Sequence, residues 1–351
     1  MSYEFDMAVF IGRFEPFTIA HATVVQKALS SAKKVTVVIG SANTPRNHRN
    51  PWTYEERAAM IKAAFPLDAD RIITRPLEDT IYNDEKWTKD VQAAVNDAFT
   101  EAFGAWHPLA KVALIGHGKD NTSFYLSLFP QWDSINVENI GGISATDVRD
   151  WYFGSDSEYF QRINSAVLPA STDAFLTEFR NTADFENIRD EYEFVAKYKK
   201  SWDAAPFKPT FVTVDAVVVQ SGHVLLVQRG ARPGKGLWAL PGGFLEQGEW
   251  IQDGAIRELR EETKIKVPEA VLRGNIKASR VFDDPNRSAR GRTITHAYLI
   301  HLPPATALPK IKGSDDAVKA KWLPISDIKR NMMFEDHYDI VQAMIDLLKI
   351  K

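Results

Sequence analysis

The sequence predicts an α/β protein of two domains, with a parallel sheet in the first domain. The chain has 351 residues, which is enough for two domains that each bury a sizeable core. In the first half, short apolar runs alternate with segments of helical period, a pattern typical of βαβ units. In the second half, two apolar runs flank the turn Ser221–His223, and a glutamate-rich helix follows. We therefore expect a parallel sheet followed by a mixed α/β or α+β domain.

The first predicted elements are two strands with a helix between them. The strands are the apolar runs Met7–Ile11 and Val35–Ile39, and the helix is expected from about His21 to Ala32. Lys111–Ile115 is a further candidate strand. Ligands of parallel sheets bind at the carboxyl ends of the strands, so we expect the first site where these strands end.

A connecting helix is predicted between the two halves. Apolar residues recur at helical spacing from about Asp184 to Trp202, with acidic residues first and lysines last, which suits the helix dipole. Pro206 and Pro209 then end the helix. The predicted limits are 1–183 for the first domain, 184–206 for the connecting helix and linker, and 207–351 for the second domain.

The second half continues with strands and closes with a helix. Thr210–Gln220 and Val224–Gln228 are expected to pair around the turn, and further strands are expected near Lys277–Phe282 and Thr293–Leu302. The last helix is expected from about Glu335 to Leu348. The sequence contains no internal repeat, so the two halves are not copies of one another.

Composition and charge narrow the classes of partner. The formal net charge of -3 gives no general attraction to nucleic acid or to anionic membranes, so we expect neither as a partner. Cysteine is absent, which excludes disulfides, thiolate metal sites and a cysteine nucleophile. The first residues lack the basic and apolar blocks of a signal peptide, and no apolar run approaches membrane-spanning length, so a cytoplasmic location is expected. The sequence leaves open whether the chain forms a homo-oligomer.

The string Gly12–His21 joins the first strand to the first helix and suits a phosphate ligand. Gly12 at the strand end lets a phosphate approach the backbone, and the helix N-terminus supplies N–H donors. Thr18 and His21 lie three residues apart, so both can face one ligand from the first helical turn. The alternative is a capped helix with Thr18 as its N-cap and an incidental histidine, but the complete string favours a site.

A second segment, Ile143–Arg149, also has features that suit a phosphate ligand at the start of a helix. Ser144 or Thr146 can cap a helix, and Arg149 lies near its first turn. A guanidinium at that place can neutralise a triphosphate through paired hydrogen bonds. For this segment alone, an ordinary helix cap with a surface arginine is an equally good interpretation.

Together the two segments resemble the nucleotidylyltransferase superfamily, whose patterns are Gly-x-Phe-x-Pro-x-His/Thr-x-Gly-His and Ile-Ser-x-Thr-x-x-Arg. Ala20 replaces the family glycine. The resemblance implies a Rossmann-like nucleotidylyltransferase domain that uses ATP, with His21 and Arg149 as catalytic residues that stabilise the phosphates. The implied nucleotide-binding residues are Gly12, Arg13, Phe14, Thr18, His21, Ser144, Thr146 and Arg149.

A third stretch resembles the archaeal-type nicotinamide mononucleotide (NMN) adenylyltransferases. It includes Gly40–Ala42 and Asn50–Thr53. By that resemblance the NMN-binding residues are Asn50, Asp79, Asn83 and Trp87. Trp87 would stack on the nicotinamide ring, although alone it is more typical of a half-buried aromatic residue on a helix. The implied reaction joins NMN and ATP to give NAD and pyrophosphate, and nicotinate mononucleotide is an alternative acceptor.

A dense carboxylate array lies between Gly243 and Ile265, with the pattern Gly-x5-Glu-x7-Arg-Glu-Leu-x-Glu-Glu-x-Lys-Ile. Glu258, Glu261 and Glu262 stand at positions i, i+3 and i+4, so their side chains share one face of a predicted helix. Clustered carboxylates repel one another, and a hard cation such as Mg2+ relieves that repulsion because it prefers oxygen ligands. A solvated helix face is the commoner structure for such a run, but the Gly-Gly turn and the full spacing favour a metal site.

The array resembles the Nudix box, the signature of hydrolases that act on nucleoside diphosphates linked to another moiety, and so implies an α/β Nudix domain. Glu249 and Arg257 can pair and hold the preceding loop against the helix. Lys264 replaces a family glycine that follows the helix, and a lysine in a left-handed conformation there would cost about 1 kcal/mol. By resemblance the ligands of Mg2+, or of Mn2+ as the alternative metal, are Glu258, Glu261, Glu262 and the carbonyl of Gly242.

Three arginines suggest the substrate of the second domain. Arg287, Arg290 and Arg292 lie in a stretch that resembles a loop of ADP-ribose pyrophosphatases. Ser314–Ala317 and Phe334–His337 are similar to the same group. By resemblance the arginines bind ADP-ribose, which a metal-activated water cleaves to AMP and ribose 5-phosphate. The alternative for the arginines is a basic surface hairpin.

Several alternatives stay open for the second domain. Glu258, Asp315 and Asp316 are all candidates for the general base. The domain can act on another nucleoside diphosphate derivative, or it can bind ADP-ribose or NAD as a sensor without turnover. The intact carboxylates favour an enzyme, because binding alone does not require all of them. We therefore expect a bifunctional enzyme of NAD metabolism with ATP, NMN and ADP-ribose as its substrates.

Overall fold

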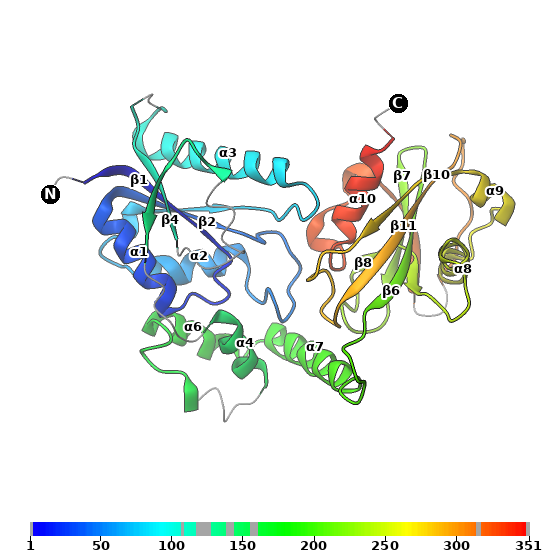
Figure 1. Cartoon of the computed structure of the whole chain (residues 1–351), viewed down its shortest axis with the longest axis horizontal. Helices are drawn as coiled ribbons and strands as arrows, with labels where there is room; N and C mark the ends of the chain where they lie inside the picture. Colours follow the sequence, from blue (N-terminus) through cyan, green and yellow to red (C-terminus); the bar gives the residue numbers. More distant parts are fainter. Residues whose placement is uncertain are drawn as a thin grey trace. The chain divides into compact units, whose positions relative to one another are not determined.

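The computed structural model describes residues 3–106, 109–116, 128–137, 144–154, 161–313 and 317–348. The chain divides into two compact units, Met1–Tyr192 and Glu193–Lys351. The division falls within helix α7 (Ala183–Lys200), which covers most of the segment in which a connecting helix is predicted (Figure 1). The predicted domain limits, at 183 and 207, stay predictions.

The first unit contains a parallel five-stranded sheet in the order β3-β2-β1-β4-β5 (Figure 1). Its strands are β1 (Phe5–Gly12), β2 (Ala32–Ile39), β3 (Ile72–Pro76), β4 (Val112–Gly116) and β5 (Asp133–Asn136). The central strands are buried on both faces, which is why they appear in the sequence as continuous apolar runs. The strand order reverses at β1, between β2 and β4, so the loop that begins at Gly12 lies at the switch point where such sheets bind ligands.

Helices cover both faces of this sheet. They are α1 (Ile19–Ser31), α2 (Tyr54–Ala63), α3 (Asp84–Phe103), α4 (Ala145–Gly154) and α6 (Ala170–Phe179), with the 3-10 turn η1 (Ala69–Arg71). Ala8 and Phe10 of β1 belong to the core shared with α1 and α2. Val9 and Ile11, on the other face of the strand, pack in the core that contains α3. No described helix combines the length and the apolar character needed to cross a membrane.

The second unit is built on a mixed sheet with the main order β10-β11-β6-β7-β12. Its strands are β6 (Phe211–Gln220), β7 (His223–Arg229), β8 (Trp238–Ala239), β9 (Gly242–Phe244), β10 (Ile276–Phe282), β11 (Thr293–His301) and β12 (Ala317–Pro324). Its helices are α8 (Ile251–Thr263), α9 (Glu269–Gly274) and α10 (His337–Asp346), with the 3-10 turns η3 (Ile325–Asp327) and η4 (Arg330–Met332). The β6–β7 hairpin turns through Ser221 and Gly222, whose φ angles are 47° and 74°.

The structure confirms the predicted fold class, a Rossmann-like parallel sheet followed by an α/β second unit. All the strands named in the sequence analysis are present, with ends that differ from the predicted ones by at most three residues. The first helix ends at Ser31, one residue earlier than expected, because Ala32 already begins β2. Elements without a strong apolar pattern were not foreseen, among them α2, β3 and β12.

Candidate active sites

The loop after β1 presents the N-terminus of α1 at the switch point of the first sheet. A Cβ on Gly12 would lie 2.9 Å from the ring of Phe14, which folds back over the strand end with a φ of 57°. Thr18 is the N-cap of α1, and its side chain accepts the N–H of His21 at 3.5 Å. His21 returns the contact, because its Nδ1 accepts the backbone N–H of Thr18 at 3.1 Å. The sequence left a capped helix and a phosphate site as alternatives for this string. The N-cap contact and the residues of the predicted site are the same, so the two interpretations are compatible.

The capping contact fixes the proton position on His21. A ring nitrogen that accepts an N–H cannot itself carry a proton, so the neutral ring carries its proton on Nε2. Phe14 and Phe17 pack against the ring, with centroid distances of 5.1 and 5.8 Å. The predicted role of His21, donation to a phosphate oxygen, requires a proton on that nitrogen.

Arg149 enters the same region from α4. Its guanidinium donates to the backbone carbonyl of Glu15 and to Oγ1 of Thr146, the latter at 3.1 Å. Burial, and then the positive charge of Arg13, lowers the pKa of Arg149 to about 10, so the group stays protonated at neutral pH. Arg49 lowers this pKa as well, which places a third cation near the loop. Arg49 is not among the residues predicted from the sequence, although its position directly before the Asn50–Thr53 stretch is a signal for it.

Ser144 caps the helix that carries Arg149. Its Oγ accepts the N–H of Asp147 at 3.2 Å, and the Asp147 carboxylate accepts the N–H of Ser144 at 2.8 Å. Of the two caps considered from the sequence, the structure uses Ser144, while Thr146 contacts the guanidinium. Ile143 lies outside the described residues.

Three of the four predicted NMN residues lie between the end of β3 and the first turn of α3. Asp79 lies at the carboxyl edge of the sheet, where a Cβ on Gly40 would lie 3.5 Å from Oδ1 of Asp79 and 3.8 Å from Cγ of Arg13. Asn83 caps α3 by accepting an N–H at 2.9 Å, and Trp87 is half-buried against Phe129 at a centroid distance of 6.1 Å.

Asn50 lies on the segment before α2. Its backbone N–H donates to the Asn47 side chain at 2.9 Å. Its Oδ1 atom is buried and has no hydrogen-bond partner among the described residues. A buried acceptor without a donor is costly, so this oxygen is suited to a ligand that supplies one. The binding roles of all four NMN residues stay predictions.

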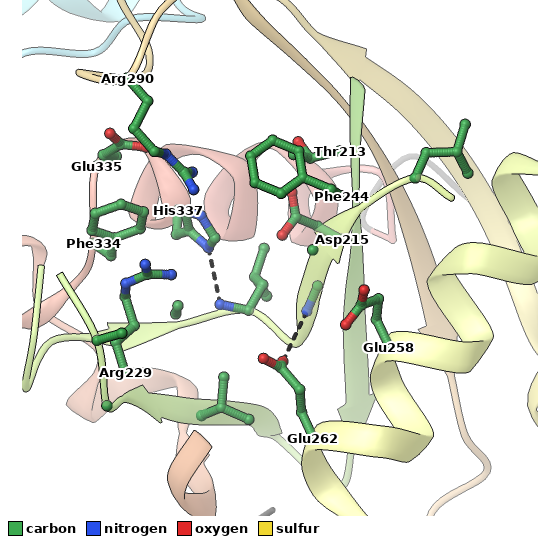
Figure 2. Close-up of a pocket in the computed structure, with 18 of the residues that line it drawn as sticks. Thr213, Asp215, Arg229, Phe244, Glu258, Glu262, Arg290, Phe334, Glu335 and His337 are labelled. Carbon is green, nitrogen blue, oxygen red and sulfur yellow. Dashed lines mark hydrogen bonds between the residues drawn. The ribbon is translucent and has the colours of Figure 1, made fainter. Parts of the chain in front are cut away.

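A cavity of about 410 Å³ lies in the second unit (Figure 2). Acidic residues line one side of it, with Asp215 on β6 and Glu258 and Glu262 on α8. Arg287 and Arg290, from the β10–β11 connection, line another part. The remaining wall includes Arg229, Phe244, Phe334, Glu335 and His337.

The carboxylates of this cavity are held close enough to raise one another's pKa. Glu262 Oε2 accepts the N–H of Gly242 at 3.0 Å. The pKa of Glu262 is raised to about 8, mainly by burial and also by the charges of Glu258 and Asp215, while the Gly242 hydrogen bond lowers it. Burial likewise raises the pKa of Asp215 to about 6. A divalent cation favours carboxylate oxygens and would relieve the repulsion between these acids.

Glu261 is the most exposed of the three predicted ligands. Its side chain is 48% exposed, does not line the cavity, and accepts from Arg257 at 3.0 Å. Arg257 also pairs with Glu249 at 2.8 Å, as predicted, and with Glu258 at 2.8 Å. Among the described residues no three acidic or histidine side chains are gathered as a metal site, so the ligand roles stay predictions. Asp215, a single acid within the apolar run of β6, is the acidic residue that the sequence analysis missed.

Two glycines give the carboxylates their space. A Cβ on Gly243 would lie 2.5 Å from Oε1 of Glu258, and a Cβ on Gly242 would lie 2.6 Å from Oδ1 of Asp215. Strand β9 can therefore pass between these two acids only without side chains. This is the physical reason for the Gly-Gly pair in front of the helix.

The three predicted arginines have different environments. Arg287 is buried and forms a bidentate pair with Asp336, at 2.8 and 2.9 Å. Arg290 lines the cavity, and its guanidinium lies 5.1 Å from the centre of the Phe244 ring. Arg292 does not line the cavity and donates to the carbonyl of Asp283.

Two further predicted features concern loops of this unit. Phe334, Glu335 and His337 line the cavity, so the similarity of the stretch Phe334–His337 to ADP-ribose pyrophosphatases falls on cavity residues. Residues 314–316 lie outside the described residues, and with them the general-base candidates Asp315 and Asp316.

Comparison with known proteins finds a different family in each half of the chain. A cytidylyltransferase-like family model matches residues 9–217, and a NUDIX domain model matches residues 209–344. The nicotinamide/nicotinic acid mononucleotide adenylyltransferase of Acinetobacter baylyi is 38% identical over 192 residues, which are 54% of this chain and 95% of that protein. The ADP-ribose pyrophosphatase of Methanocaldococcus jannaschii is 30% identical over 131 residues, which are 37% of this chain and 70% of that protein.

A solved structure matches both units at once. It is a bifunctional NMN adenylyltransferase/ADP ribose pyrophosphatase from Francisella tularensis in complex with AMP and an Mn ion, with a TM-score of 0.88 and 37% identity. The match covers 98% of this chain and 99% of the other. The chain belongs to this family of bifunctional enzymes. The predicted membership, a nucleotidylyltransferase fused to a Nudix hydrolase, is thereby confirmed.

Proposed function

We propose that the first unit transfers AMP from ATP to NMN, giving NAD and pyrophosphate, and that the Nudix unit hydrolyses ADP-ribose to AMP and ribose 5-phosphate. The observation that carries this proposal is the similarity to the Francisella enzyme over nearly the whole of both chains. The candidate sites described above contain residues suited to each reaction, which supports the proposal.

In the transferase reaction the NMN phosphate attacks the α-phosphorus of ATP, a new P–O bond forms, and pyrophosphate leaves. No covalent intermediate with the protein is needed, so catalysis consists of positioning and charge stabilisation. Arg149 and Arg13 would neutralise the phosphates, and Nε2 of His21 would donate to an oxygen that gains charge. The backbone N–H groups at the start of α1 add to this field.

In the hydrolase reaction a water oxygen attacks one phosphorus of the diphosphate, and the P–O–P bridge breaks. Glu258, Glu262 and Asp215 would hold a divalent metal, with Mg2+ as the proposed ion and Mn2+ as the alternative. When bound, the metal would neutralise the diphosphate and activate the water. Arg290 and Phe244 would contact the remainder of ADP-ribose across the cavity.

Product analysis of the purified chain tests the proposal. One reaction contains NMN, ATP and Mg2+, and the other contains ADP-ribose and Mg2+. We expect NAD in the first and AMP with ribose 5-phosphate in the second. If the chain binds ADP-ribose but releases no AMP, the second unit acts as a sensor and not as a hydrolase. The similarity to an enzyme over the full length of the chain argues against that outcome.

A second pyridine acceptor belongs in the same experiment. The Acinetobacter relative carries both nicotinamide and nicotinic acid mononucleotide in its name, so nicotinate mononucleotide is the specific alternative for this chain. Parallel reactions with the two acceptors give the ratio of their kcat/KM values. A cytoplasmic location and the absence of a nucleic-acid partner stay predictions from the sequence.

A further inference from the structure

We propose that Arg57 and Glu15 are positioning residues of the transferase site, which fix the phosphate-binding loop against the part of the site assigned to NMN. This inference rests on the proposed transferase function and extends it to two residues buried beneath the loop. Their side chains are 1% exposed or less, so they would act through the groups that they hold.

Arg57 connects the ends of two neighbouring strands. Its Nη1 donates to the carbonyl oxygens of Arg13 at 2.7 Å and of Gly40 at 2.8 Å. Its Nη2 donates to the carbonyl oxygen of Ser41 at 3.2 Å. Arg13 follows β1, and Gly40 and Ser41 follow β2, so the guanidinium spans the sheet edge at which the substrates would bind.

Glu15 holds three separate segments to the loop. Its Oε1 lies 3.1 Å from Nη1 of Arg57, and its Oε2 accepts the N–H of Trp52 at 3.3 Å. Its backbone carbonyl accepts a hydrogen bond from Arg149. Trp52 belongs to the same segment as Asn50, so Glu15 contacts both the predicted catalytic arginine and a predicted NMN segment.

The contacts form a continuous path between the two halves of the site. The N–H of Ser41 donates to Asp79 at 3.2 Å, and its hydroxyl donates to the same carboxylate. From Asp79 the path runs through Ser41, Arg57 and Glu15 to Arg149. A residue that binds NMN and a residue that binds the triphosphate would therefore keep a fixed distance.

Stability alone is a weak reason for such a pair. A buried ion pair loses its hydration, and apolar residues of similar volume often stabilise a fold as well or better. A planar guanidinium can donate to three carbonyls and pair with a carboxylate, which neither lysine nor an apolar side chain can do. The pair is thus better suited to hold geometry than to add stability.

The double variant Glu15→Gln/Arg57→Met separates these two roles. It removes both charges together, so no unpaired charge remains buried, but the carbonyl oxygens of Arg13, Gly40 and Ser41 lose their donor, and we expect a lower thermal midpoint. We expect kcat for NAD synthesis to fall about a hundredfold, because a small misplacement of reacting groups has an effect of that order. ADP-ribose hydrolysis by the same preparation should not change, which reports the amount of protein assayed, whereas the thermal midpoint reports the folding of the first unit. Arg57→Lys, which keeps the charge but not the planar donors, should also lose most of kcat.

Arg71 offers a matched control in the same sheet. Its guanidinium donates to the carbonyl oxygens of Leu29 at 2.7 Å and Ala32 at 2.8 Å and pairs with Asp68 at 2.7 Å. These groups lie where β2 begins, at the end of the strand away from the site. Arg71→Met should therefore lower the thermal midpoint and leave kcat for NAD synthesis unchanged.

Three outcomes would overturn the inference. Wild-type kcat in both the double variant and Arg57→Lys would show that the pair does not position the substrates. An equal loss of kcat in Arg71→Met would show a general effect of stability. If the wild-type chain makes no dinucleotide from either pyridine mononucleotide, the proposed transferase function is wrong, and this inference falls with it.

Discussion

Single residues decide how the Nudix cavity brings its carboxylates together. Glu258 and Asp215 occupy the space that side chains on Gly243 and Gly242 would need. The positions of the acids thus depend on two residues that carry no functional group. Their effect on activity can be measured without removal of any proposed ligand.

Gly243→Ala should reduce ADP-ribose hydrolysis while NAD synthesis is unchanged. The new Cβ would lie 2.5 Å from Oε1 of Glu258, so the carboxylate must leave its present position. We expect kcat to fall about tenfold to a hundredfold, measured as AMP release at saturating metal. The control is Gly274→Ala, where a Cβ would meet no atom within 4 Å. Equal rates for wild type and Gly243→Ala would contradict this account of the Gly-Gly pair.

His337 makes the stability of the Nudix unit depend on pH. Its ring is buried, and Nδ1 accepts the N–H of Leu240 at 2.9 Å, which requires an unprotonated nitrogen. Burial, and then the charges of Arg287 and Arg229, lowers the pKa of His337 well below 6.5. The unfolded chain therefore binds a proton that the folded chain does not, so stability is present above the unfolded pKa and falls as the pH drops below it.

His337→Asn tests this dependence, because the asparagine oxygen can accept the same N–H without titrating. Between pH 6 and pH 5 the free energy of unfolding of the wild type should fall relative to that of the variant. The expected difference approaches about 1.4 kcal/mol per pH unit, measured by urea unfolding at each pH. Parallel curves for the two proteins would mean that His337 does not carry the effect.

The residues of the two sites could be predicted where the pattern that indicates them lies within a short stretch of sequence. Thr18 and His21, three residues apart, form the capping contact that their spacing allows. Asp215 and Arg49 were missed, because their importance depends on which distant elements lie beside them. The position of Glu261 outside the cavity was not foreseen for another reason, since the spacing of glutamates on a helix does not show which of them will face a cavity.

At the scale of elements, helix α8 ends as the Nudix pattern predicts but with a lysine in the glycine position. Lys264 is the C-cap, with φ of 44° and ψ of 34°, and its N–H donates to the carbonyl of Arg260 at 3.0 Å. The left-handed conformation is therefore kept despite the side chain. The departure from the family pattern affects the end of the helix and leaves the acids unchanged.

Lys264→Gly should stabilise the Nudix unit. Glycine adopts the left-handed conformation without the steric cost of a Cβ, so we expect the free energy of unfolding to rise by about 1 kcal/mol. Lys264→Ala is the matched control and should change it little, because alanine carries the same Cβ. Chemical unfolding of the three proteins at one pH measures the difference. A gain for alanine equal to that for glycine would point to the lysine charge instead of the backbone.

The predictability of the elements follows the strength of their apolar pattern. Strands β1, β2 and β6 are buried on both faces and stand out as continuous apolar runs. Strand β12 alternates lysines with other residues, and β3 contains only two large apolar side chains, so neither gives a clear signal. Both strands are defined by pairing with a partner that lies elsewhere in the chain.

At the scale of the molecule, one chain contains two units, and each unit has a candidate active site of its own. The parallel sheet of the first unit and the mixed sheet of the second are separate, and each carries its own candidate site. The presence of one site in each unit was predictable, because the motifs of each site lie within one half of the sequence. The limits of the units were less accessible, since the division falls within the continuous helix α7.

The most direct measurement assays both reactions on two variants, one for each site. His21→Ala should abolish NAD synthesis, because it removes the proposed donor to the phosphate, and should retain wild-type ADP-ribose hydrolysis. Glu262→Gln should do the reverse, because it removes a proposed metal ligand. NAD and AMP are quantified from the same preparation of each protein. Equal loss of both activities in either variant, or near wild-type NAD synthesis by His21→Ala, would contradict the assignment of two separate sites.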